Sequence, residues 1–207
     1  MSAGGAGWRP CYTLPMTTRK EALPVSATTR KPWTADELGR LPKPWRYEID
    51  EGELVIMSPA GKRHGRLANR IAYYITDFVY EHKLGEVIGG EVGVYLHRDP
   101  DILRGIDVAF YSNERNHQAG DVVGFPDVPP DLAVEIHLPD EHDMPRKVAQ
   151  YLAAGVRSVW VIDPDAATLT QHRPGEAPRT LAGSGEVVEE SVLPGFTCRL
   201  RDLFGEQ

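Results

Sequence analysis

A long amphipathic segment places the strongest constraint on the fold of this chain. Over residues 62–83, apolar side chains recur at intervals of three and four residues, which is the period of an α-helix with one buried face. The positions that carry this pattern are Leu67, Ile71, Tyr74, Ile75, Phe78 and Val79. Such a helix must pack its apolar stripe against another element, and strand-like segments lie on both sides of it in the sequence. The pattern therefore predicts a layered fold in which this helix covers a sheet.

Strand-like segments account for much of the remaining sequence. Before the long helix, residues 46–57 predict a β-hairpin that turns at residues 50–52. After it, residues 86–96 and 105–111 are rich in Val, Ile and aromatic residues, with a polar turn between them, and predict two strands. Residues 112–130 contain many Gly, Asn and Pro residues, so we expect an irregular loop there.

The second half of the chain repeats the alternation of strand and helix. Residues 131–137 predict a third strand, and residues 156–162 are nearly all apolar, which predicts a fourth strand in the interior of the sheet. Shorter strands are expected near Leu169, Val187 and Phe196.

Two shorter helices complete the predicted elements. A capping box at residues 34–37 precedes a short helix that Pro42 and Pro44 would end. Asp143 is placed to cap a second helix, which would stop at Gly155.

In chain order, the core elements are a helix, three strands, a helix and a strand. This αβββαβ order predicts an α/β fold with a mixed sheet flanked by helices, together with an N-terminal hairpin and extra C-terminal strands. We expect residues 33–207 to form a single domain.

Residues 1–32 differ in composition from the rest of the chain. They contain five basic residues and one acidic residue, whereas the whole chain carries a net charge of −7. Several prolines and few large apolar residues leave little surface to bury, so we expect a disordered basic tail. The tail fits either a solvated leader or an arm that contacts nucleic acid.

Several features favour a cytoplasmic protein without a membrane partner. The two cysteines, Cys11 and Cys198, are far apart and form no framework for disulfides or metal. No apolar run approaches the roughly 20 residues needed to span a bilayer. The N-terminus also lacks the basic and apolar regions of a secretory signal. We expect no organic cofactor.

Two carboxylates that interrupt apolar strands are the first candidates for chemistry. Asp107 and Glu135 each lie between two aliphatic residues, in neighbouring predicted strands. Because strand side chains alternate between faces, the two carboxylates can lie side by side, and His137 shares the face of Glu135. Two converging carboxylates suit Mg²⁺ or Mn²⁺ beside a substrate phosphate. Each could equally point to solvent or pair with Lys or Arg, and periodicity does not separate these alternatives.

The start of the long helix is strongly basic. It contains Lys62, Arg63, His64, Arg66 and Arg70, with no acidic residue over these nine positions. Arg63, Arg66 and Arg70 share one helical face by their spacing, which suits contacts to nucleic-acid phosphates. A solvated helix face is the alternative. The negative charge of the rest of the chain argues against strong nonspecific DNA binding unless this patch is focused.

A set of short motifs resembles one known family over about residues 34–204. In chain order the motifs are RYEIDEGEL at 46–54, MSP at 57–59, His64, IDV at 106–108, LAVEI at 132–136, Lys147 to Tyr151 to Gly155-Val156, WVIDP at 160–164 and LPGF at 193–196. Each motif is weak alone, but their number and order together are specific. They are similar to those of the Uma-two family of putative restriction endonucleases, which belongs to the PD-(D/E)XK nuclease superfamily. The resemblance implies the αβββαβ core of that superfamily, although a fold alone does not establish an activity.

The resemblance also implies roles for particular residues. The first metal-binding acid of the superfamily falls on Asp107 and the second on Glu135. The lysine expected two residues after Glu135 is absent, and His137 stands in its place. The candidates for the role of that lysine are His137 itself and Lys147 in the following helix, although Lys147 also fits a solvated helix position.

Two further acids match the superfamily motif by letter only. Asp127 and Asp131 each follow a proline, but Asp127 lies in the predicted loop and Asp131 lies in the same strand as Glu135. We therefore expect neither of them to hold metal.

Taken together, the resemblance implies a Mg²⁺- or Mn²⁺-dependent DNA endonuclease that hydrolyses phosphodiester bonds. A homodimer is expected because such enzymes cut two strands. The missing strand lysine leaves open a catalytically degenerate nuclease fold that binds DNA or a protein partner. Residues 135–143, which are rich in His, Asp and Glu, also leave open a zinc-dependent hydrolase, although they lack the helical HExxH arrangement.

Overall fold

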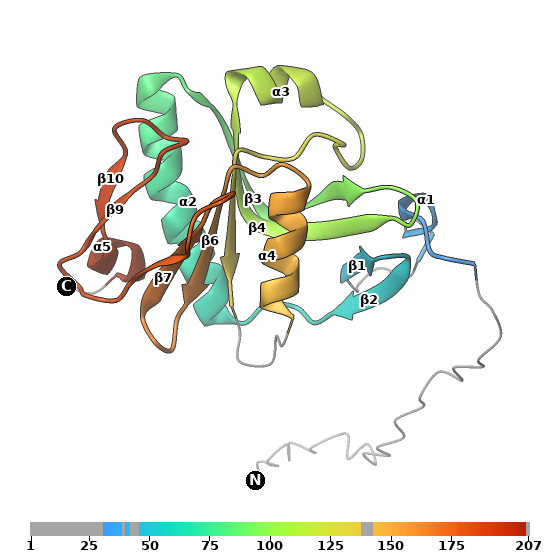
Figure 1. Ribbon diagram of the computed structural model, residues 1–207, viewed down its shortest axis with the longest axis horizontal. Coiled ribbons are helices and arrows are strands. Elements are labelled where there is room, and N and C mark those ends of the chain that lie inside the picture. The colour runs from blue at the N-terminus through green and yellow to red at the C-terminus, as the bar shows by residue number, and fades with distance from the viewer. Residues whose placement is uncertain (1–30, 39, 42–45, 138–142, 206–207) are drawn as a thin grey trace, which may run out of the picture. The chain divides into compact units, whose positions relative to one another are not determined.

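The computed structural model describes residues 31–38, 40–41, 46–137 and 143–205 of the chain. All of the helices and strands in these ranges lie within Pro32–Gln207, and Figure 1 shows their arrangement. The predicted disordered tail falls almost wholly outside the described residues, as do Pro42 and Pro44.

The first part of the fold contains the predicted hairpin, the long helix and two long strands. Its elements are α1 (Ala35–Leu38), β1 (Arg46–Asp50), β2 (Glu53–Met57), α2 (Lys62–His82), β3 (Gly85–His97), β4 (Ile102–Ser112) and α3 (Asn113–Ala119). Except for α3, these elements confirm the predictions to within a few residues at each end.

The second part continues the predicted alternation and adds one short strand and one short C-terminal helix. Its elements are β5 (Leu132–Ile136), α4 (Met144–Ala153), β6 (Ser158–Asp163), β7 (Thr168–His172), β8 (Arg179–Leu181), β9 (Val187–Glu189), β10 (Thr197–Arg199) and α5 (Leu200–Phe204). No helix among the described residues is long and apolar enough to cross a bilayer.

Strands β1 to β8 form one mixed sheet. Seven of them follow the order β2-β1-β4-β5-β6-β7-β8, and β3 pairs with β4 beside this path. β5 pairs antiparallel with β4 and parallel with β6, so the connection through α4 crosses from one strand to the next in the same direction. β6 lies between β5 and β7, which confirms its predicted interior position. β9 and β10 form a separate pair.

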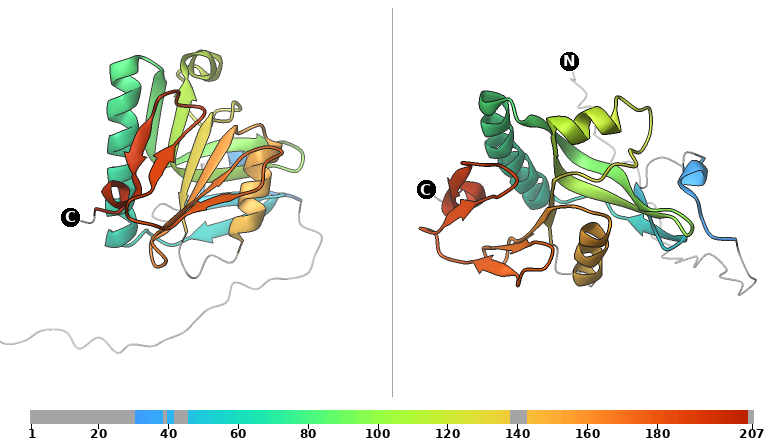
Figure 2. Two further views of the ribbon diagram at one scale, coloured as in Figure 1. Left: turned by 60° about the vertical axis from the view of Figure 1, so that its left-hand side comes forward. Right: turned by 45° about the horizontal axis from the view of Figure 1, so that its top comes forward.

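Helices α2 and α4 cover opposite faces of this sheet (Figures 1 and 2). The buried stripe of α2 packs against strands β4, β5 and β6, whereas Val148 of α4 packs on the other face. Side chains alternate along β5, since Val134 belongs to the core under α2 and Ala133 to the core under α4. Glu135 follows Ala133 by two residues and therefore faces α4.

Two local predictions differ from the structure. Residues 112–130 are not wholly irregular, because α3 follows β4 directly and the Ser112 hydroxyl accepts a hydrogen bond from the Arg115 N–H at 3.4 Å. Asp143 occupies the N-cap position of α4, but its side chain makes no capping hydrogen bond. Its carboxylate lies instead 3.9 Å from Nη2 of Arg104, so an ion pair takes the place of the predicted cap.

Candidate active site

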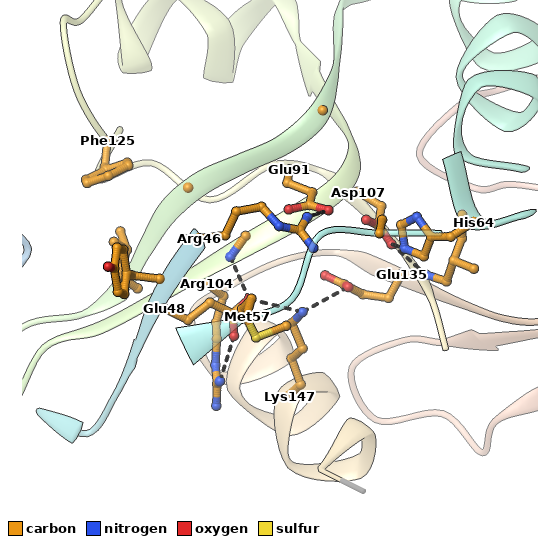
Figure 3. A pocket seen from close by; sticks show the side chains of 17 residues that line it. Arg46, Glu48, Met57, His64, Glu91, Arg104, Asp107, Phe125, Glu135 and Lys147 are labelled. Atoms are coloured by element: carbon orange, nitrogen blue, oxygen red, sulfur yellow. Dashed lines mark hydrogen bonds and ion pairs between the residues drawn. The ribbon is translucent and has the colours of Figure 1, made fainter. Parts of the chain in front are cut away.

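A cavity of about 260 Å³ opens where β1, β3, β4 and β5 meet the first turn of α2 and the helix α4 (Figure 3). Its lining is unusually rich in charge. The charged and imidazole side chains are Arg46, Glu48, His64, Glu91, Arg104, Asp107, Glu135 and Lys147. The structure therefore brings together both acids singled out from the sequence and one of the two candidates for the missing lysine.

Asp107 lies where the pairing of β4 with β5 ends. The backbone pairing runs as far as Val108 with Val134, so Asp107 and Glu135 are next to each other in the same register. Beyond this pair, the Asp107 side chain replaces a backbone carbonyl as the hydrogen-bond acceptor. Its Oδ2 accepts a hydrogen bond from the Ile136 N–H at 2.8 Å. The orientation of the Asp107 side chain is thereby tied to the backbone of β5.

His64 enters the cavity from the first turn of α2. Its Nε2 lies 3.1 Å from Oδ2 of Asp107, and both side chains are buried. The sequence analysis grouped His64 with the basic residues at the start of the helix, and in the structure its side chain lies on the buried face. The reason is visible in the spacing, because His64 precedes Leu67 and Ile71 by three and seven residues and so extends the apolar stripe.

Helix α4 supplies one group to each oxygen of the Glu135 carboxylate. Lys147 Nζ donates to Oε2 at 3.0 Å, and the Tyr151 hydroxyl donates to Oε1 at 2.5 Å. The two donors are four residues apart and therefore share one face of the helix. Lys147 Nζ also lies 3.3 Å from Oε1 of Glu48. An ammonium thus stands beside Glu135 although strand β5 itself carries no lysine.

Burial dominates the electrostatics of Glu135. It raises the pKa of this carboxyl to about 8, against the lowering effect of Lys147 and with a further increase from the charge of Asp107. Burial likewise raises the pKa of Tyr151 well above its usual value, so the hydroxyl remains a donor. Additional positive charge in the cavity would lower this pKa.

Glu48 is a site residue that the sequence analysis did not single out. Its Oε2 accepts a hydrogen bond from Arg104 Nη1 at 3.0 Å, and its Oε1 accepts one from the Gly105 N–H at 2.9 Å. Arg104 is itself buried and also contacts Asp50 and Gln150. This network joins β1, β4 and α4 at one side of the cavity. The available signal was a carboxylate inside a half-buried strand, the same signal that identified the two other acids.

The donor set of the cavity fits a hard divalent ion. Mg²⁺ sites commonly use one or two carboxylates and complete their coordination with water and substrate phosphate oxygens. Asp107 and Glu135 supply two carboxylates in one cavity, and a divalent charge would offset the cost of ionising the buried Glu135. Among the described residues, no group of three or more His, Cys, Asp or Glu side chains could hold a metal ion, so the remaining ligands would have to be water, main chain or substrate.

His137, the other candidate for the role of the missing lysine, is not among the residues that line the cavity. It follows the last residue of β5, and its N–H donates to the Ile162 carbonyl at 2.8 Å. Its Nδ1 is buried and has no hydrogen-bond partner within the described part of the chain. The run considered for zinc continues from His137 into residues 138–142, which lie outside the described residues.

The basic side chains at the start of α2 differ in their contacts with the rest of the protein. Lys62 and Arg66 are exposed. Arg63 forms an ion pair with Asp165, and Arg70 lies against the C-terminal end of α5. Two of the three arginines that the spacing placed on one face are therefore in contact with other parts of the protein.

The two acids that match the superfamily motif by letter only do not line the cavity. Asp127 is exposed and lies 2.6 Å from Nη2 of Arg98. Asp131 is fully buried, where it accepts a hydrogen bond from the Ser112 N–H at 2.7 Å and pairs with Arg157 at 2.9 Å. Asp131 therefore connects the end of β4 with the starts of β5 and β6.

Comparison with known protein families identifies one match over most of the chain. The model of the Uma2 family, described as putative restriction endonuclease, matches residues 35–201. The chain belongs to this family. This match confirms the resemblance found in the motifs of the sequence. The charged cavity described above therefore belongs to a Uma2 protein.

The solved structures also include a similar fold. A putative nuclease belonging to DUF820 from Anabaena variabilis ATCC 29413 has 21% sequence identity and a TM-score of 0.73, over 84% of this chain and 99% of that chain. At this identity the likeness concerns the fold alone, and it confirms the predicted mixed sheet flanked by helices. No curated protein matches the chain.

Proposed function

We propose that this Uma2 protein is a divalent-metal-dependent endonuclease that hydrolyses phosphodiester bonds in DNA. The observation that carries the proposal is the convergence of Asp107, Glu135 and Lys147 in one cavity. Attack on a phosphodiester builds negative charge on the phosphate oxygens and on the leaving oxygen, so cations placed in advance lower the barrier. Two carboxylates that can hold a divalent ion, with an ammonium beside them, match this requirement.

Asp107 and Glu135 would hold the ion, Mg²⁺ or Mn²⁺, which when bound supplies Lewis-acid polarisation of the scissile phosphate. The Ile136 N–H keeps the Asp107 carboxylate in place, and Tyr151 orients that of Glu135. Lys147 brings a positive charge next to Glu135, where it would bind a phosphate oxygen that enters the cavity. The side chains are therefore oriented before substrate arrives, which reduces the reorganisation needed for reaction.

A nuclease fold that binds DNA without cutting it is the second candidate. The observation that favours it is the full engagement of Glu135, whose two carboxylate oxygens each accept a hydrogen bond. If these bonds persist with DNA bound, Glu135 contributes little to holding an ion.

Incubation of supercoiled plasmid with the full-length protein separates the two candidates. The endonuclease converts plasmid to nicked or linear DNA with Mg²⁺ or Mn²⁺, and EDTA or the Asp107→Asn change stops the conversion. Binding of DNA with no cut under any divalent ion would overturn the endonuclease in favour of the binding protein. Cleavage that requires copurified zinc would instead support the zinc hydrolase. The molecular mass in solution tests the expected homodimer.

A further inference from the structure

We propose that an unpaired stretch of nucleic acid next to the scissile phosphate binds along a track formed by Tyr47, Phe125, Tyr95 and Arg98. We call these four residues the aromatic track. This inference rests on the proposed function and adds the substrate class: a single strand, or a duplex with a single-stranded extension or bubble.

The aromatic track begins in the carboxylate cavity. Tyr47 and Phe125 line that cavity and also a second, more open one of about 780 Å³. Tyr95 and Arg98 line the second cavity as well. Figure 3 shows Phe125 at the opposite end of the first cavity from Asp107. A polymer whose phosphate lies at the carboxylates therefore passes Phe125 on its way into the second cavity.

Phe125 is held in place while much of its ring stays open. It is 40% exposed, and it lies on Gly93 of β3, where a Cβ would come within 2.5 Å of the ring. Its ring meets that of Tyr95 edge to face, with the centroids 6.3 Å apart. The next carbonyl, that of Pro126, accepts a hydrogen bond from the Tyr95 N–H at 3.0 Å. A ring fixed in this way loses little conformational entropy when a flat group stacks on it.

Arg98 provides a second flat surface in the same cavity. Its guanidinium lies 3.7 Å from the centroid of the Tyr95 ring, and its ion pair with Asp127 holds it there at 2.6 Å. The Arg98 side chain is nevertheless 54% exposed. Nucleobases stack on guanidinium planes as well as on aromatic rings, with a cation–π contribution.

Stacking of this kind selects for unpaired bases. In a continuous duplex the base faces are covered by their neighbours, whereas single-strand-binding proteins present aromatic side chains on which successive exposed bases stack. Within the aromatic track, Phe125 and Arg98 are the exposed surfaces, and the buried Tyr95 packs against both of them. The track adjoins a cavity with the acids and the lysine suited to a phosphodiester. A single-stranded segment satisfies both parts of this arrangement at once.

The test measures binding by the full-length Asp107→Asn protein, which should not cut, in the presence of Mg²⁺. The probes are a 2-aminopurine-labelled single strand and a blunt duplex of the same sequence. Phe125→Leu should weaken binding of the single strand about tenfold, because a base loses the aromatic ring on which it stacks, and should leave duplex binding unchanged. Phe125→Trp should retain both the affinity and the quenching of 2-aminopurine that stacking produces.

Two further variants make the test specific. Tyr80→Leu replaces another exposed aromatic residue, which lines neither cavity, and should change nothing. Arg98→Lys keeps the charge but removes the flat guanidinium, so it should weaken single-strand binding and not duplex binding, even if Phe125→Leu does not fold.

Three results would overturn the inference: equal losses for single strand and duplex, an equal loss with Tyr80→Leu, or unchanged quenching in Phe125→Leu. These results are separable from failure of the proposed function. Cleavage of plasmid with no dependence of single-strand binding on Phe125 would support the proposed function and contradict the aromatic track. Binding of single strands through Phe125 without any cleavage would support the aromatic track and contradict the nuclease.

Discussion

Lys147 Nζ lies 3.0 Å from Oε2 of Glu135, although the two residues are twelve positions apart and belong to different elements. The contact follows from the topology, because Glu135 projects from the face of β5 that α4 covers, and Lys147 lies on the side of α4 that faces the sheet. The superfamily's usual position for this ammonium, two residues after the second acid, is occupied by His137, which does not line the cavity. The helix therefore supplies the charge that the strand lacks.

Replacing Lys147 by Met should reduce divalent-dependent plasmid cleavage by roughly 10²-fold or more, as expected when one electrostatic stabiliser of the transition state is lost. Mn²⁺ binding, followed by calorimetry, should persist because both carboxylates remain. His137→Ala is the matched control and should cut at nearly the normal rate. Loss of a partner from a buried ion pair costs about 3–5 kcal/mol, so thermal unfolding must show that the Lys147 variant is folded. Cleavage that survives in Lys147→Met but disappears in His137→Ala would assign the role to the histidine.

Asp107→Asn should abolish both cleavage and binding of the divalent ion, because the amide removes a negative charge from the pair of acids that would hold the ion. Asp127→Asn is the control, since this acid follows a proline as the motif requires but lies on the surface in an ion pair with Arg98. It should leave metal binding unchanged. Equal losses of metal binding in the two variants, measured by calorimetry, would mean that the cavity is not where the ion binds.

The elements that could be predicted from the sequence are those with a strong period or an uninterrupted apolar run. The stripe of α2 has a helical period, and β6 is almost wholly apolar, so each pattern has one physical interpretation. Helix α3 had no such pattern. Its residues suit a turn as well as a helix, and only its direct start from β4, with Ser112 as the cap, distinguishes the two.

The acids of the site were predictable for a related reason, since a carboxylate within an apolar strand needs a partner or a function. What the sequence could not provide was the partner. Tyr151 reaches Glu135 from sixteen positions away, and Glu48 meets Arg104 from fifty-six. Such pairs depend on how helices and strands pack together. The spacing of residues along the chain does not determine this packing.

The exposed cations at the start of α2 give a prediction about salt dependence. Replacing both Lys62 and Arg66 by Ala should reduce the slope of log affinity against log salt by about 2 for duplex DNA, because each phosphate contact contributes ~0.9 to that slope. Replacing Arg63 and Arg70, which already contact other parts of the protein, should leave the slope nearly unchanged. Fluorescence anisotropy at several salt concentrations measures both. A larger change in the second pair than in the first would mean that Arg63 and Arg70 leave their protein partners to bind DNA.

The raised pKa of Glu135 makes the stability of the metal-free protein depend on pH in a definite direction. The carboxyl has a pKa of about 8 in the folded protein against a usual value of 4.5. Between these values the folded state keeps a proton that the unfolded chain has released, so the free energy of unfolding falls as pH rises, by at most about 1.4 kcal/mol per pH unit from this group. Above the folded pKa the loss is complete and the curve levels off.

Glu135→Gln removes this titration, and its single carbonyl oxygen can accept the hydrogen bond of Lys147 or that of Tyr151, but not both in the geometry seen for Glu135. In urea unfolding with EDTA, the variant should therefore gain stability relative to the unmodified protein as pH rises from about 5 to 8. Saturating Mg²⁺ should reverse the gain, because an ion that binds the ionised carboxylate stabilises only the unmodified protein. If the unmodified protein instead became the more stable of the two with rising pH in EDTA, attraction to Lys147 would outweigh burial. Glu135 would then be ionised before any metal binds.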